Sequence, residues 1–239
     1  MNRRVKRALL IALALIAALL VFLPMRIVFD ASGLGGRGIS ARSVEGSVWS
    51  GTIRDLRLGR LAIGDMDASL SPIALLSGET LLEMTRAHDA ADLTPLSFDL
   101  AKSGNALALR NATGEVGAAD LLAPLPVRSL ALDGVNIAFD GSKCAAASGA
   151  VRVNIEQSLF GITLQRGLSG TVRCDGGDLL LPLKGQSGLE QMDIRITGAG
   201  RYSADFRLGG LGAGMGAALG ALGFRQQGDA MTIRINGRF

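Results

Sequence analysis

Apolar and polar residues alternate along most of the chain, from about residue 39 to the end. In the stretch Val151–Ile155, for example, Arg152 and Asn154 separate three apolar residues. The same period of two occurs at Leu56 and Leu58, Leu107 and Leu109, Val135, Ile137 and Phe139, Leu179, Leu181 and Leu183, Met192, Ile194 and Ile196, and Met231, Ile233 and Ile235. Because this period buries one face of a strand, it predicts an all-β domain, a curved or folded-over antiparallel sheet of roughly ten or more strands.

The pattern also makes finer predictions. Pro182 cannot donate a ladder hydrogen bond, so the strand around it is expected at a sheet edge or close to a strand end. Short helices are expected at residues 72–77 and in part of 211–222. The apolar face needs a cover, and a second sheet, curling of the same sheet or a partner would each supply one.

An uncharged apolar run, Ala8–Met25, precedes the β region. As a helix it would be roughly 27 Å long, enough to cross the hydrocarbon core of a bilayer. A cleaved signal peptide and a permanent anchor both fit such a run. The bulky residues 21–29 offer no small-residue cleavage site, and the run exceeds an ordinary signal-peptide core, so we favour the anchor.

The charges around this run predict its orientation. Arg3, Arg4, Lys6 and Arg7 lie before it, and only Arg26 follows directly. By the positive-inside rule the N-terminus is cytoplasmic and the rest lies outside, in the periplasm of a bacterium. We therefore expect a single-pass inner-membrane protein with a basic tip (1–7), a transmembrane anchor (8–25), a linker (26–38) and a periplasmic β domain (39–239).

The composition argues against several classes of function. Without the basic tip, 21 Lys and Arg balance 21 Asp and Glu, so the folded part lacks the basic face of a nucleic-acid-binding protein. The only histidine, His88, has no nucleophile motif beside it and is expected at the surface. No catalytic, cofactor-binding or metal-binding pattern is present, so we predict that the chain is not an enzyme and uses no cofactor.

The two cysteines, Cys144 and Cys174, lie 30 positions apart. In the cytosol such a pair would be two buried thiols, whereas in an oxidising compartment it is a disulfide candidate. Since the anchor places both residues outside the cytoplasm, we predict the disulfide.

The only tryptophan, Trp49, lies between Gly46 and Gly51. One interpretation makes it a cap on the β core; the other makes Trp49 and the two glycines a docking element near the membrane, because Trp favours that interface. The glycine-rich stretch Leu208–Phe224 likewise fits either a loop with a short helix packed on the sheet or a membrane-surface element.

Several segments, taken in order, resemble type II secretion system protein N (general secretion pathway protein N). They are EGSVWSGTI (45–53), SPIALLSGE (71–79), KCAAASGAVRV (143–153), GLSGTVRCDGGDLLLPL (167–183) and LGFRQQGDAMTIRINGRF (222–239), together with the N-terminal anchor. The resemblance implies an accessory inner-membrane protein that assists export of folded proteins across the outer membrane. Its implied partners are other secretion components and exported proteins. Such proteins are also similar to periplasmic AsmA-like proteins with lipid-handling grooves, which makes lipid an alternative partner.

Overall fold

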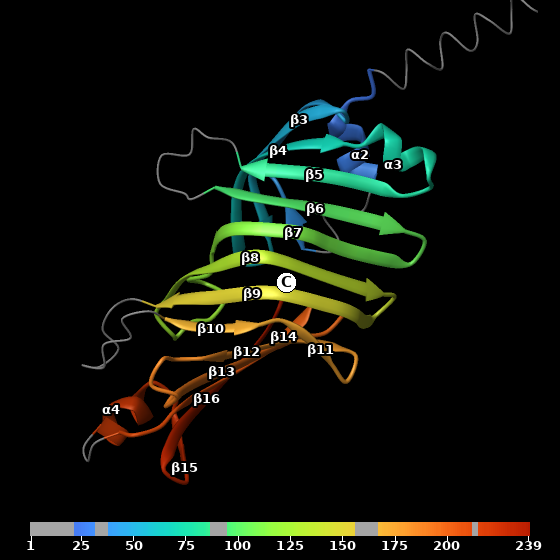
Figure 1. Ribbon diagram of the computed structural model, residues 1–239. Helices are drawn as coiled ribbons and strands as arrows, with labels where there is room; N and C mark the ends of the chain where they lie inside the picture. Colours follow the sequence, from blue (N-terminus) through green and yellow to red (C-terminus); the bar gives the residue numbers. More distant parts are fainter. Residues whose placement is uncertain (1–21, 32–37, 87–94, 156–166, 212–214) are drawn as a thin grey trace, which may run out of the picture.

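A computed structural model of the chain describes residues 22–31, 38–86, 95–155, 167–211 and 215–239. Within these residues, sixteen strands form one sheet, which confirms the all-β antiparallel prediction (Figure 1). The strands are β1 (Ile39–Ser40), β2 (Ser43–Ser47), β3 (Ser50–Leu58), β4 (Leu61–Leu70), β5 (Thr80–Arg86), β6 (Leu96–Ser103), β7 (Ala106–Gly117), β8 (Val127–Asp140), β9 (Lys143–Ile155), β10 (Leu168–Thr171), β11 (Arg173–Asp175), β12 (Asp178–Lys184), β13 (Glu190–Ile196), β14 (Arg201–Leu208), β15 (Arg225–Gln227) and β16 (Ala230–Arg238). Short helices occur at α2 (Met25–Ala31), α3 (Pro72–Leu76) and α4 (Met215–Ala221).

Most strands pair with their neighbours in sequence, as the short connections predict. The order along the sheet is β1-β3-β4-β5-β6-β7-β8-β9-β10-β12-β13-β14-β16-β15, with β2 also on β3 and β11 also on β12. Every apolar alternation found in the sequence lies in a strand, and the two expected helices are α3 and α4. Helix α2 begins at Met25, the last residue of the predicted anchor, and continues into the predicted linker.

Pro182 corrects one expectation, because it lies inside the sheet. It is a central residue of β12 and pairs with Asp193 of β13. On the other side of β12, β10 pairs only at Lys184 and β11 only at Asp178–Leu180. Pro182 falls in the gap between these two short strands, so the sheet accommodates it without the edge position that its missing N–H suggested.

The β3–β4 hairpin bends and returns over the inner face of the sheet. The bend occurs at Asp55, which has a φ of 50° and lies at a register shift in β3. The backbone N–H of Asp55 donates to Asp65 Oδ1 at 2.7 Å, and Arg42 and Arg57 both contact its carboxylate. Beyond the bend, Ala62 of β4 pairs with Gly117 of β7, although β5 and β6 separate those strands in the sheet order.

The inner face is therefore covered by curling of the same sheet and by its own connections. One buried cluster lies between β2 and β7, a larger one lies between β7 and β16, and Leu61, Phe98, Leu130 and Leu132 pack against both. The connection between β7 and β8 adds the buried residues Leu121, Leu122 and Leu125 to the larger cluster. Leu168, Met192 and Phe206 are among its fully buried side chains.

Tyr202 joins three parts of this interior. Its hydroxyl donates a 2.7 Å hydrogen bond to the carbonyl of Leu121, and its ring lies 5.2 Å from that of Phe239. The backbone of Phe239 in turn lies close to Gly38 and Gly59, so the end of β16 meets the far end of the β3–β4 hairpin. Burial raises the pKa of the Tyr202 phenol, because the phenolate would lose its hydration.

Tyr202→Phe is expected to lower the free energy of unfolding by about 1 kcal/mol at neutral pH, since a buried carbonyl loses its donor. The wild-type protein should also lose stability above about pH 10, because the unfolded phenol ionises there while the folded phenol keeps its proton. Urea unfolding at neutral and alkaline pH measures both effects. If the variant and the wild type lost stability equally at high pH, the burial argument for Tyr202 would be wrong.

The predicted anchor lies mostly outside the described residues, which begin at Phe22. Among the helices of the described part, none is long and apolar enough to cross a membrane. The anchor therefore stays a prediction.

Candidate functional site

The tryptophan lies in the tight turn between β2 and β3. Ser47 pairs with Ser50, so Val48 and Trp49 form the two turn positions. Val48 is buried, and the partly buried Trp49 packs against the cluster between β2 and β7. Ser50, the next residue, is exposed. This packing supports the interpretation of Trp49 as a cap on the core, while its docking role stays a prediction.

Gly46 and Gly51 both lie so close to neighbouring atoms that neither position has room for a side chain. Gly46 pairs with Gly51 and has a φ of +86°, where a Cβ would lie 2.6 Å from the carbonyl oxygen of Ser50. A Cβ on Gly51 would lie 2.4 Å from Met25 Sδ and 2.7 Å from the carbonyl oxygen of Glu45. The absence of side chains therefore lets the chain that leaves the predicted anchor lie directly on this hairpin.

Hydrogen bonds fasten that segment to the sheet. Val48 donates its backbone N–H to Leu23 at 3.0 Å and accepts from Leu70 at 2.9 Å, and Pro24 forms a bridge with Ser47. Met25 is buried in the same cluster. The exit from the predicted anchor, the tryptophan turn and the end of β4 consequently form one unit.

The solvent face of this unit is polar. A cleft of about 380 Å³ is lined by Glu45, Gly46, Ser50, Gly51, Thr52, Asp67, Ala68, Ser69, Glu83 and Thr85. Thr52 donates to Asp67 across the cleft at 3.0 Å, and three carboxylates, from β2, β4 and β5, face it. Two of the predicted docking residues, Gly46 and Gly51, thus line a hollow with acidic walls.

The sheet also offers backbone at an edge. The edge strand β15 pairs with only the first three residues of β16, so β16 beyond Thr232 has a sheet neighbour on one side among the described strands. Such an edge can pair with an added strand. Apolar contact at the tryptophan turn and strand addition at β16 are two docking chemistries available at these places.

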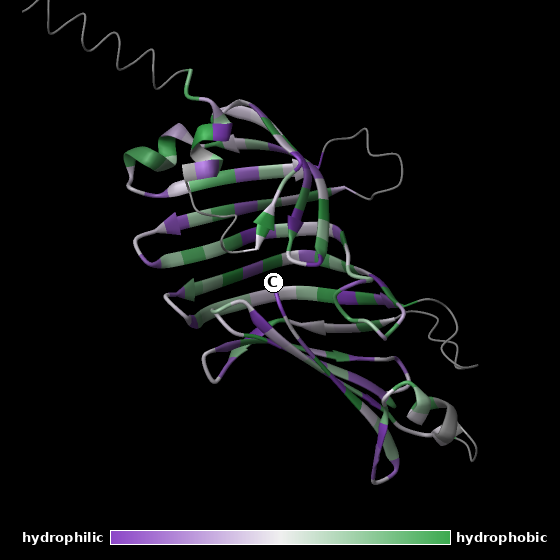
Figure 2. Cartoon of the chain, turned by 180° about the vertical axis from the view of Figure 1, so that it is seen from behind, coloured by the Kyte–Doolittle hydropathy of each residue, from purple (hydrophilic) through white to green (hydrophobic). Residues whose placement is uncertain are grey.

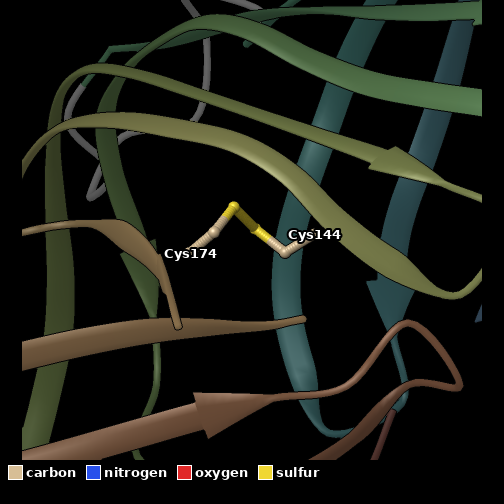
Figure 3. The surroundings of a disulfide bond; sticks show 2 residues. All are labelled: Cys144 and Cys174. Carbon is tan, nitrogen blue, oxygen red and sulfur yellow. A yellow bond between two sulfur atoms is a disulfide. The ribbon is translucent and has the colours of Figure 1, made fainter. Parts of the chain in front are cut away.

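The predicted disulfide between Cys144 and Cys174 is confirmed (Figure 3). Their Cα atoms lie 5.6 Å apart, a normal separation for a disulfide. Cys144 lies in β9 and Cys174 in β11, and Cys144 also donates its backbone N–H to Gly177 at 2.7 Å. The bond holds the short β11–β12 hairpin against the long strand β9.

A buried polar cluster joins β5, β7, β8 and β9, and the sequence interpretation missed it. The guanidinium of Arg86 donates to the carbonyl of Glu115 at 2.8 Å and to that of Ile63 at 2.6 Å. It therefore bridges β4 and β7 where the returning hairpin meets the sheet. Burial lowers the pKa of Arg86, an effect that the nearby Glu115 charge opposes.

The carboxylate of Glu115 is itself held by polar neighbours. It accepts from the Ser129 hydroxyl and, at 2.9 Å, from the Asn154 amide. These contacts give the cluster a structural role, because they hold the returning β3–β4 hairpin against β7. In the sequence, Arg86 stands where the alternation of Leu82 and Met84 predicts another apolar residue. This charged residue was the signal that could have revealed the cluster.

His88 falls outside the described part, as do residues 212–214 of the glycine-rich stretch. In the described portion of that stretch, Leu219 of α4 and Phe224 are buried in the larger cluster. This packing favours a helix packed on the sheet. No group of three or more metal-ligating side chains occurs among the residues that the structure describes.

Comparison with known proteins bears on the whole β domain. The family model of the type II secretion system (T2SS), protein N, matches residues 37–234. No curated protein and no solved structure matches the chain. The match begins just before β1 and ends within β16, so it covers the sheet that carries the turn, the disulfide and the polar cluster. The chain belongs to the type II secretion system protein N family.

Proposed function

We propose that this protein is an accessory inner-membrane component of the type II secretion system. In this proposal the apolar run that begins at Ala8 is a single transmembrane anchor, and its last residues, 23–25, have left the bilayer and lie on the β domain. Residues 1–7 are cytoplasmic and the β domain is periplasmic. The domain docks with other secretion components and so assists export of folded proteins across the outer membrane. The family is one of secretion components and is not known as an enzyme family.

The observation that carries the proposal is the extent of the family match, which covers the β domain and omits the apolar N-terminus. The family's shared role is therefore expected to reside in the sheet. The disulfide supports a periplasmic location, because such bonds persist in oxidising compartments. The tryptophan turn, fastened to the anchor exit through Leu23 and Val48, supports docking close to the membrane.

The test is photo-crosslinking in living cells, with a photoreactive residue in place of the exposed Ser50. Adducts with other secretion components or with exported proteins are the expected result, and a clean deletion should reduce export of folded substrates. A photoreactive residue at the exposed Gln186, in the β12–β13 turn, is the matched control and should give fewer such adducts. Equal adducts at both positions would contradict docking at the tryptophan turn.

A lipid-handling groove is the alternative that this experiment separates. Adducts at Ser50 with phospholipid or lipopolysaccharide would favour it. The dense packing of the inner face, where Leu122, Leu168 and Met192 are fully buried, argues against an open groove there.

A further inference from the structure

Exposed apolar side chains gather at one end of the described sheet. Five of the eight large apolar residues that are exposed in the described part lie in two segments, Phe22 and Ile27 around α2 and Ile73, Leu75 and Leu76 in α3. Leu76 is 90% exposed and Ile73 is 78% exposed. Figure 2 shows apolar ribbon at α3, beside α2. Contiguous exposed apolar surface commonly marks a protein or membrane contact.

The α3 turn is held in this exposed position. Ser71 caps the helix by accepting from the Ala74 N–H, and Ser77 and Glu79 both donate to the Ala74 carbonyl. The carboxylate of Glu79 forms an ion pair with Arg110 of β7 at 2.5 Å. None of the residues of α3 is buried. The apolar side chains therefore project from a fastened turn and contribute nothing to the core.

The turn is also tied to the place where the predicted anchor ends. Ser71 follows Leu70, which donates to Val48, and Val48 donates to Leu23. The exposed Phe22 directly precedes Leu23, and both lie close to the end of the apolar run Ala8–Met25. Residues Leu70–Gly78 contain no charge. Two backbone hydrogen bonds thus connect an uncharged apolar turn to the end of an apolar run long enough to span a bilayer.

We propose that α3 lies in the surface of the same bilayer that holds the N-terminal anchor, with Ile73 and Leu76 inserted at the boundary between headgroups and acyl chains. This inference rests on the proposed inner-membrane placement. Apolar side chains of interfacial segments insert roughly 5–10 Å into that boundary. A second membrane contact beside the anchor restricts rotation of the β domain, so it orients the tryptophan turn and the acidic cleft relative to the membrane.

The test uses the full chain in vesicles of phosphatidylethanolamine and phosphatidylglycerol. Leu76→Cys carries an environment-sensitive fluorophore, Ile73→Cys is an independent second position, and Leu189→Cys, at an exposed leucine before β13, is the matched control. The fluorophore at 73 or 76 should shift to the blue, and a shallow spin-labelled lipid should quench it about twofold more strongly than a deep one. The fluorophore at 189 should show neither effect.

Alkaline carbonate extraction of the same vesicles reports separately on the anchor. Retained protein with quenched labels at 73 and 76 supports the inference. Retained protein with unquenched labels overturns it, leaves the anchor intact and makes a protein the occupant of the α3 surface. Released protein with unquenched labels overturns the inference and the anchor together.

Discussion

Replacing both cysteines with alanine is expected to lower the free energy of unfolding by about 3–4 kcal/mol. Cys144 and Cys174 close a long loop, with a sequence separation of 30, and opening it gives the unfolded chain more conformations. The bond also holds β11 on β9, so its loss should loosen the β11–β12 hairpin. Urea unfolding of the β domain measures the loss, which corresponds to a fall in Tm on the order of 10 °C.

Reduction supplies the control for this experiment. A thiol reductant should destabilise the wild-type domain by the same amount and leave the double alanine variant unchanged. If the variant were as stable as the oxidised wild type, the disulfide would be dispensable, and its use as support for a periplasmic location would be weakened. If reductant acted equally on both proteins, its effect would not come from this bond.

Strands were predictable from the sequence wherever one face of the strand is buried and the other is exposed to solvent. β9, β13 and β16 show the period of two, because each has a largely apolar face against a cluster and a polar face in solvent. β12 departs from this pattern, since Leu179, Leu180 and Leu181 are buried in succession. Pro182 was expected at an edge because it has no N–H to donate, and local sequence could not show that β10 and β11 leave this position of β12 unpaired on one side.

The return of the β3–β4 hairpin was not predictable from local pattern. It depends on Asp55, a non-glycine residue with positive φ, whose conformation is stabilised by Asp65, Arg42 and Arg57. Such a conformation is uncommon for a side-chain-bearing residue and arises here from contacts that form only in the folded sheet. The sequence alone therefore did not decide what covers the inner face of the sheet.

The candidate site was predictable in part. Two glycines around a lone tryptophan indicated a tight turn, and the structure explains Gly46 by its positive φ and Gly51 by its contact with Met25. The chain position of Trp49 also suggested proximity to the anchor, and the hydrogen bonds of Val48 supply the link. The acidic cleft could not be foreseen, because its carboxylates come from three different strands.

Arg86→Met is expected to lower the free energy of unfolding by about 2–4 kcal/mol. Methionine keeps much of the apolar stem but removes the donors to the carbonyls of Ile63 and Glu115, and it removes the positive charge near the Glu115 carboxylate. Since those carbonyls flank the pairing of Ala62 with Gly117, the contact between β4 and β7 should open before the rest of the sheet. Amide hydrogen exchange in β4 and β7, together with urea unfolding, measures both results.

Two further variants separate the geometry of Arg86 from its charge. Arg86→Lys keeps the charge but lacks the planar fork that reaches two strands at once, so it should recover only part of the lost stability. Arg110→Met removes the partly buried ion pair with Glu79, which lies away from the returning hairpin, and should cost about 1 kcal/mol. If lysine restored full stability, charge alone would explain the role of Arg86. If Arg110→Met lost as much stability as Arg86→Met, the buried position of Arg86 between β4 and β7 would not explain its importance. We expect the free energy of unfolding to rise from Arg86→Met to Arg86→Lys and then to Arg110→Met. This order follows only if the Arg86 guanidinium holds the returning hairpin on β7.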